Sequence, residues 1–321
     1  MRVAVYLPLL FPLLAALVAR PVGEKLPPRL ATWLLTVGAL VLAAGSTAVL
    51  GMLAITGLIR IPFLARLAQD HWSPYAAQHH DPASFSVAVL AGVLLTAAAV
   101  LAGRMLWRRS RTLAQAAREA ACLPGRDQLV VVDDPAAEAY AIPGLPGRIV
   151  VSTGMLDALD PAEHQILLAH ERAHLAHHHY LFVALAQFAA AANPLLRPLA
   201  TTVTFTVERW ADESAAAAVG DRERVARTVG KAALAARRTR ARNRIPAAAL
   251  GLLGRLGRLR PNTLGPVPRR VTALLVPAPR RHIWSAAALS GLAAATALCA
   301  AEAAHDLEAL LELAKHAATG S

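Results

Sequence analysis

Two histidines and a glutamate in the segment ILLAHERAHLAHHH have the residue types and the spacing of a zinc-dependent hydrolase. His170 and His174 are four residues apart, so on a helix they lie on one face, one turn apart, where both imidazoles can bind one metal ion. Glu171 lies about 100° around the helix from His170, where its carboxylate can take a proton from the attacking water. The pattern H-E-x-x-H therefore predicts metal-assisted hydrolysis. A histidine-rich, solvated helix is the alternative.

A catalytic zinc usually has three protein ligands, so the sequence must supply a third. The pattern H-E-x-x-H-x-x-G-x-x-H is excluded, because His177 stands where it needs Gly and Tyr180 stands where it needs His. The later segment VERWADESAAAA offers Glu208 as a ligand and, four residues on, Asp212 to hold a ligand histidine by its second ring nitrogen. Glu213 competes for both roles, and a surface carboxylate paired with a neighbouring arginine is the alternative for Glu208.

The motif lies in a helix with clear start signals. Asp160 suits an N-cap, Pro161 suits the first helical position, and Glu163 completes a capping box. We expect this helix to end near residue 179. A second helical pattern, interrupted at Asn193-Pro194, continues to Gly220.

Two features beside the motif leave alternatives open. The run His177, His178 and His179 permits a second metal site, but a solvated helix end is the preferred interpretation. The apolar residues 181–192 are too few to span a bilayer. They indicate either a buried helix or a hairpin that dips into the membrane.

Three short segments before the motif predict a small β-sheet. Residues 128–134 (QLVVVDD) form a β-branched run between turn residues, and residues 138–142 and 148–152 form two further strands. The turn Pro143-Gly144-Leu145-Pro146-Gly147 joins the last two.

Four apolar runs predict transmembrane helices. They contain no acidic or basic residue and cover residues 3–19, 31–59, 84–103 and 284–301. The composition agrees, with 56% hydrophobic residues, 17% charged residues and a mean hydropathy of +0.43. A cleaved signal peptide is disfavoured for the first run, because it contains two prolines and no clear cleavage site.

Lysine and arginine gather after the first and third runs, and such residues favour the cytoplasmic side. We therefore expect residues 1–103 to hold three spans, with the N-terminus and the 60–83 loop outside. Residues 104–283 form a cytoplasmic domain. The fourth span leads to a short extracytoplasmic tail, 302–321.

The chain is strongly basic, with a net charge of +12 and a pI of about 11.0. Residues 221–283 hold sixteen Lys/Arg against two acidic residues, and no aromatic residue. Nucleic-acid binding is one interpretation, but no base-stacking surface is visible. We expect a charged flank of the last span and no nucleic-acid partner. Two cysteines exclude a disulfide framework and a cysteine-based zinc finger.

The motifs H-E-R-A-H and E-R-W-A-D together resemble the membrane-bound gluzincin peptidases, in which H-E-x-x-H is followed by E-x-x-x-D. This group includes HtpX-like heat-shock proteases and CAAX prenyl endopeptidases. The span layout and the segment EAYAIPGLPGRIVVSTGMLDALDPAEHQILLAHERAH are most similar to the BlaR/MecR type, the peptidase part of beta-lactam sensor–transducers. The resemblance is specific over about residues 128–220. Only about twenty residues follow the last span and they contain no S-x-x-K, so direct sensing of beta-lactams is not expected.

The resemblance implies a mainly α membrane protein with four transmembrane helices and a cytoplasmic zincin-like (gluzincin) α+β peptidase domain. It implies one Zn²⁺ per chain held by His170, His174 and Glu208, with Glu171 as general base and Asp212 as the supporting carboxylate. The substrate backbone is expected to lie against the edge strand formed by Glu138, Ala139, Tyr140 and Ala141.

The expected function is therefore that of a membrane-anchored zinc metalloendopeptidase acting on a protein or peptide substrate. The resemblance implies a transcriptional repressor in a signalling pathway as that substrate. A membrane-protein quality-control protease and a zinc-binding transducer without proteolytic activity are the alternatives, and Glu171 argues against the second. An Arg or His elsewhere in 104–283 is expected to stabilise the oxyanion. The sequence gives no indication of oligomeric state.

Overall fold

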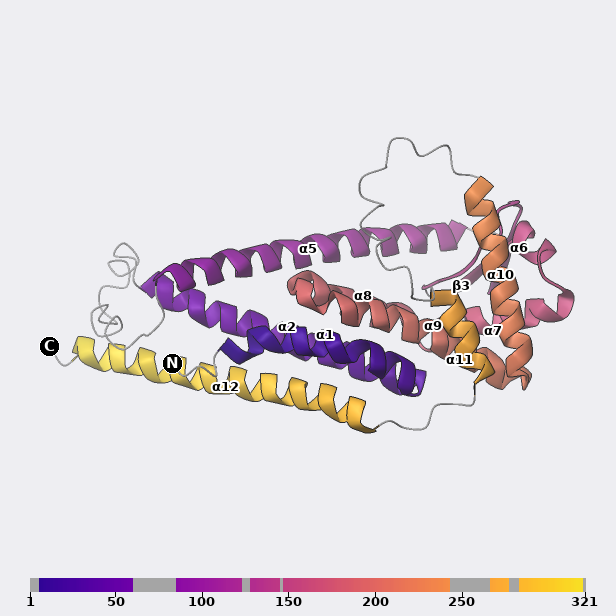
Figure 1. The fold of residues 1–321 in the computed structure, drawn as a ribbon. Coiled ribbons are helices and arrows are strands. Elements are labelled where there is room, and N and C mark those ends of the chain that lie inside the picture. Colours follow the sequence, from indigo (N-terminus) through magenta and orange to yellow (C-terminus); the bar gives the residue numbers. More distant parts are fainter. Residues whose placement is uncertain are drawn as a thin grey trace.

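The computed structural model describes residues 6–59, 85–122, 128–144, 147–242, 266–276 and 283–319. Long helices run side by side along most of the molecule, and a smaller α+β part lies at one end (Figure 1). The start of the first helix and the end of the last lie toward the opposite end. This arrangement confirms the predicted fold class of a mainly helical protein with four long apolar helices and a small mixed sheet.

Four helices are long and apolar enough to cross a membrane. They are α1 (Leu7–Lys25), α2 (Pro28–Ile59), α5 (Phe85–Cys122) and α12 (Ile283–Thr319). Each covers most or all of one predicted apolar run, and α5 and α12 continue well beyond theirs. The segment expected to be a short tail after residue 301 is therefore helical as far as Thr319, while the predicted 60–83 loop lies outside the described residues.

The sheet has three short strands, as predicted. They are β1 (Leu129–Val132), β2 (Ala139–Ile142) and β3 (Arg148–Ser152), in the order β1-β3-β2. β3 is buried along its whole length, since β1 pairs with it in parallel and β2 pairs with it antiparallel. β2 is consequently an edge strand with one side of its backbone free of the sheet.

Helices form the rest of the described chain between β3 and α12. They are α6 (Thr153–Asp157), α7 (Pro161–Ala176), α8 (His179–Ala192), η2 (Pro194–Leu196), α9 (Arg197–Val219), α10 (Arg222–Arg242) and α11 (Pro266–Leu275). The predicted capping box at Asp160 and Glu163 is present. α9 ends at Val219 and is capped by Gly220, whose φ of 76° suits glycine. α7 ends at Ala176, earlier than expected, because His178 takes a left-handed conformation.

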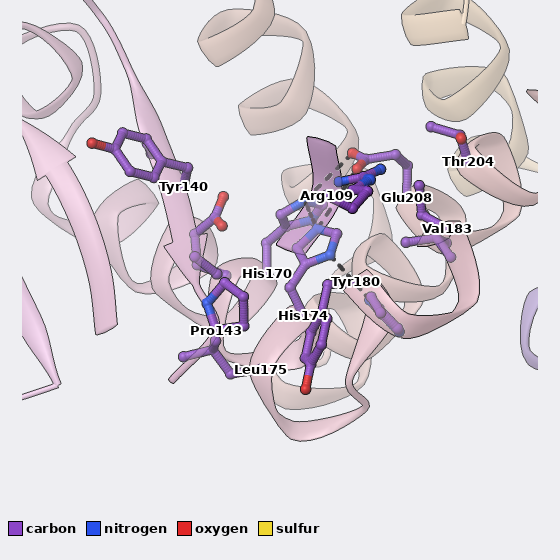
Figure 2. A pocket seen from close by; sticks show the side chains of 15 residues that line it. Arg109, Tyr140, Pro143, His170, His174, Leu175, Tyr180, Val183, Thr204 and Glu208 are labelled. Atoms are coloured by element: carbon purple, nitrogen blue, oxygen red, sulfur yellow. Dashed lines mark hydrogen bonds and ion pairs between the residues drawn. The ribbon is translucent and has the colours of Figure 1, made fainter. Parts of the chain in front are cut away.

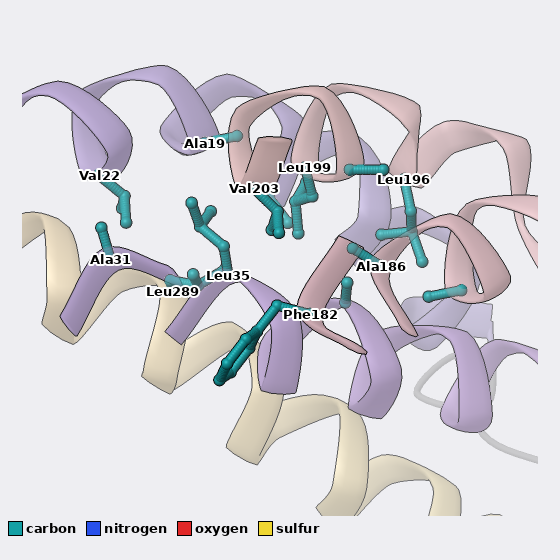
Figure 3. Close-up of a cluster of buried hydrophobic side chains, with 14 of the residues drawn as sticks. Ala19, Val22, Ala31, Leu35, Phe182, Ala186, Leu196, Leu199, Val203 and Leu289 are labelled. Atoms are coloured by element: carbon teal, nitrogen blue, oxygen red, sulfur yellow. The ribbon is translucent and has the colours of Figure 1, made fainter. Parts of the chain in front are cut away.

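The apolar residues 181–192 belong to α8, which forms a hairpin with η2 and α9. This hairpin packs against α1, α2 and α5. At its tip, Asn193 Nδ2 donates to Ser46 Oγ at 3.2 Å, within the apolar part of α2. Leu35 of α2, Phe182 of α8 and Val203 of α9 meet in one core (Figure 3). One face of the hairpin is thus buried against the long helices, while Leu185 and Phe188 on its other side are exposed. Helix α9 connects the long helices to the α+β part.

Candidate metal and catalytic centre

Helices α7 and α9 bring the three predicted ligands together. His170 and His174 project from one face of α7, with their Nε2 atoms 3.2 Å apart. Glu208 projects from α9, which packs against α7. Its Oε2 lies 3.8 Å from His170 Nε2 and its Oε1 lies 3.7 Å from His174 Nε2 (Figure 2). Within the described part of the chain, this is the one group of three such residues placed to hold a metal ion.

The spacing of these donor atoms fits zinc. Two ligands about 2.0–2.1 Å from a tetrahedral zinc ion are about 3.3–3.4 Å apart. The observed separations of 3.2, 3.7 and 3.8 Å bracket that value, and two imidazoles with one carboxylate are donors that zinc accepts. The three residues can therefore hold one zinc ion and leave a coordination position open for catalysis.

Glu171 faces the same cavity from the next position on α7. Its side chain is buried, and the backbone N–H of Ala141 in β2 bonds to it. Burial raises the pKa of the Glu171 carboxyl above its usual value, although the neighbouring His170 partly lowers it. A carboxylate with raised proton affinity beside the metal ligands is placed to act as a base.

Asp212 contacts the second ring nitrogen of His170. Its Oδ1 lies 3.1 Å from His170 Nδ1, on the side of the ring away from the other ligands. Burial alone would raise the pKa of Asp212, but hydrogen bonds from Arg270 and His170 outweigh burial and lower this pKa to about 2. Asp212 is therefore ionised at neutral pH and can fix the ring of His170.

Arg270 of α11 joins the two carboxylates of α9. Its Nη1 lies 2.8 Å from Glu208 Oε2, and it also donates two hydrogen bonds to Asp212. We expected the basic region 221–283 to be a charged flank, and for Arg270 that expectation is wrong, because its side chain faces the site and is 13% exposed. The sequence pointed only to an unspecified Arg or His in residues 104–283. Arg109 of α5, another arginine within residues 104–283, also lines the cavity beside the ligands.

Glu213, the alternative to Glu208 and Asp212, does not face the metal ligands. It forms an ion pair with Arg222, whose Nη2 donates to Glu213 Oε1 at 2.9 Å. Glu208 does not pair with Arg209, whose Nη1 donates to the Gly23 carbonyl at 2.6 Å, but with Arg270.

The interpretation of residues 177–179 as a solvated helix end holds for His178 but is wrong for His179. His179 is 1% exposed, and its Nδ1 lies 3.1 Å from His174 Nδ1. Burial lowers the pKa of His179 to about 3, and His174 adds to this effect. Among the described residues, no second metal-binding group includes these histidines.

The ligands open into a cavity of about 410 Å³ bordered by β2, α5, α8 and α9. Ala139, Tyr140 and Ala141 of β2 line it, whereas Glu138 does not. Figure 2 shows Tyr140 and Pro143 on one side of the histidines and Val183 and Thr204 on the other. The edge strand and the metal ligands thus face a common space large enough for a peptide segment.

A comparison with protein families matches the description Peptidase family M48 to residues 104–279, which is more than half of the chain. Neither the curated proteins nor the solved structures gave a match. The family match supports the resemblance to membrane-bound gluzincin peptidases but does not show the BlaR/MecR type. It covers α7, α9 and α11, the three helices that carry the ligands, Glu171, Asp212 and Arg270. The chain therefore belongs to peptidase family M48 and is a zinc-type metalloendopeptidase with membrane-spanning helices.

Proposed function

We propose that this protein hydrolyses peptide bonds of a protein substrate at the cytoplasmic surface of the membrane, with one Zn²⁺ held by His170, His174 and Glu208. The observation that carries the proposal is the position of Glu171. Its buried carboxylate shares one cavity with the three ligands, and a site that only stored zinc would not need it.

The residues of the site suggest how the reaction proceeds. Zinc, when bound, polarises the scissile carbonyl and makes a water molecule more acidic. Glu171 takes the proton of the attacking water and passes it to the leaving amine. The N–H of Ala141 holds this carboxylate in place, and the raised pKa of Glu171 favours proton uptake. Asp212 keeps His170 oriented throughout, because it is itself fixed by Arg270.

The free edge of β2 supports binding of an extended substrate. In the antiparallel pair, Ser152 N donates to Glu138 O at 3.0 Å. Hydrogen-bonding positions alternate along such a pair, so Ala139 and Ala141 direct their backbone groups away from β3. The N–H of Ala141 bonds to Glu171, so a substrate strand would pair chiefly with the backbone of Ala139. A substrate strand can add to this edge, which places its backbone beside the zinc ligands.

The charge distribution supports a cytoplasmic position for the peptidase region, because Arg104, Arg108, Arg109 and Arg111 follow the third apolar run. The resemblance to the BlaR/MecR type supports a soluble transcriptional repressor as the substrate.

A specific observation favours the second candidate, a membrane-protein substrate. A cavity of about 1470 Å³ is lined by Glu208 and Arg270 at the site and by Leu101 in the apolar part of α5. It gives a segment held in the bilayer a route toward the ligands.

The test uses the full-length protein purified in detergent. Zinc content and cleavage of casein are measured for the wild type, Glu171→Gln and Glu208→Gln. We expect one zinc and cleavage for the wild type, zinc without cleavage for Glu171→Gln, and loss of zinc for Glu208→Gln. Undiminished cleavage by Glu171→Gln, or a wild type that binds no zinc, would refute the proposal.

A matched pair of reporters separates the two substrate classes. One cleavage sequence, found by profiling the wild type, is placed in a soluble carrier or next to a transmembrane anchor. In liposomes, preferential cleavage of the anchored reporter supports a membrane-protein substrate, and preferential cleavage of the soluble reporter supports a repressor.

A further inference from the structure

The second histidine ligand has a support of its own, formed by the histidine run that follows the motif. α7 ends at Ala176, and His178 adopts φ 50° and ψ 43°. Among the described residues, His178 is the one non-glycine with positive φ. L-residues rarely adopt this conformation, and strained backbone of this kind gathers at functional sites. Here the left-handed residue lies between the end of α7 at Ala176 and the start of α8 at His179.

The consequence of this turn is the position of His179. His179 is the first residue of α8. Its ring is turned back onto α7, and its side chain is 1% exposed. The ring centroid lies 4.9 Å from that of His174 and 4.7 Å from that of Trp210. A histidine packed in this way cannot change its orientation without moving α8 or Trp210.

The contact between the two rings is made by the nitrogens that face away from the metal site. His174 directs Nε2 toward Glu208, so its proton must reside on Nδ1 when Nε2 binds zinc. Nδ1 of His179 lies 3.1 Å from that Nδ1 and can accept the proton in a hydrogen bond. His170 has a different partner on the corresponding nitrogen, the carboxylate of Asp212.

We propose that His179 is a positioning residue that fixes the tautomer and the ring orientation of the zinc ligand His174. The left-handed His178 is the backbone feature that delivers it. The two zinc-binding imidazoles are then held by unlike acceptors, a charged carboxylate for His170 and a neutral imidazole for His174. This inference rests on the proposed zinc site.

The test compares His179→Asn with His179→Leu in the full-length protein. The Asn side-chain oxygen occupies the place of the His Nδ1 and can accept from His174, whereas Leu has similar bulk and no acceptor. His178→Asn, the same replacement at the adjacent exposed position, is the matched control. Zinc affinity is measured by competition with a chromogenic chelator, and the unfolding temperature of each zinc-free protein reports packing.

We expect His179→Leu to weaken zinc binding by about 10- to 100-fold, the range typical of lost supporting hydrogen bonds. His179→Asn should stay within a few-fold of the wild type, and so should His178→Asn. If Leu and Asn variants bind zinc equally, whether as tightly as the wild type or equally weakly, His179 does not act as an acceptor and the inference is overturned. A wild type without zinc affinity would instead refute the proposed function.

Discussion

Arg270 binds Asp212 through two hydrogen bonds, from Nε to Oδ2 at 2.7 Å and from Nη2 to Oδ1 at 2.6 Å. The side chain of Asp212 is 1% exposed and that of Arg270 is 13% exposed. Each charge is therefore stabilised by the other and not by water. Because the two residues come from α9 and α11, this pair fixes α11 beside the zinc ligands.

Removing only one partner of this pair should be costly. Arg270→Gln leaves the Asp212 charge buried and poorly paired, which we expect to destabilise the zinc-free protein by about 3–5 kcal/mol. The double variant Arg270→Gln with Asp212→Asn should recover a large part of that loss, because the buried charge is gone. Thermal unfolding in detergent measures both. Equal losses for the single and double variants would show that the pair is not coupled.

The carboxylate of Asp212 should matter for zinc binding, while that of its neighbour Glu213 should not. Asp212→Asn removes the charge that orients His170, so we expect zinc affinity to fall by about 10- to 100-fold. Glu213→Gln alters a carboxylate that pairs with Arg222 and should leave zinc affinity unchanged. Chelator competition on the two variants decides between the roles, and a larger effect for Glu213→Gln would reverse the assignment.

The free edge of β2 should contribute to substrate binding through its backbone. Ala139→Pro removes an N–H that points away from β3 and leaves the ladder intact. We expect KM to rise about fivefold, the equivalent of one hydrogen bond worth about 1 kcal/mol, with zinc content unchanged. In Tyr140→Pro the lost N–H belongs to the ladder with Val150, so this control should unfold at a lower temperature. Unchanged kinetics for Ala139→Pro would argue against strand addition at this edge.

Gly154, at the start of α6, should not tolerate a side chain. A Cβ atom there would overlap the backbone carbonyl of Pro135, which cannot move without displacing the chain between β1 and β2. We expect Gly154→Ala to cost about 1–3 kcal/mol. Gly103→Ala in α5 is the control, since nothing lies within 4 Å of its added Cβ. Equal unfolding temperatures for the two variants would contradict this prediction.

Local signals made the ligand helix and the spans predictable. The capping box at Asp160, the four-residue spacing of His170 and His174, and the uncharged apolar runs depend on neighbouring residues in the sequence. They required no knowledge of tertiary packing.

The supporting residues were not predictable in the same way. Arg270 lies 58 residues from Asp212, and nothing near it in the sequence distinguishes it from the other arginines of its basic region. His179 looked like part of a polar helix end because the left-handed turn at His178 has no sequence signal as strong as glycine. Glu208 and Glu213 became distinguishable only in three dimensions, where Glu208 lies beside the two histidines and Glu213 pairs with Arg222.

Helix α9 has 23 residues and is therefore about 34 Å long. Leu199 and Val203 in its first half are buried among the long helices, whereas Glu208 lies at its midpoint and Asp212 in its second half. Its first half packs among the long helices, and the part from Glu208 onward reaches the ligand site. A tilt of α1 or α2 that moved the first half of α9 would change the distance from Glu208 to the two histidines of α7. The packing of the spans and the geometry of the ligand site therefore share one continuous helix.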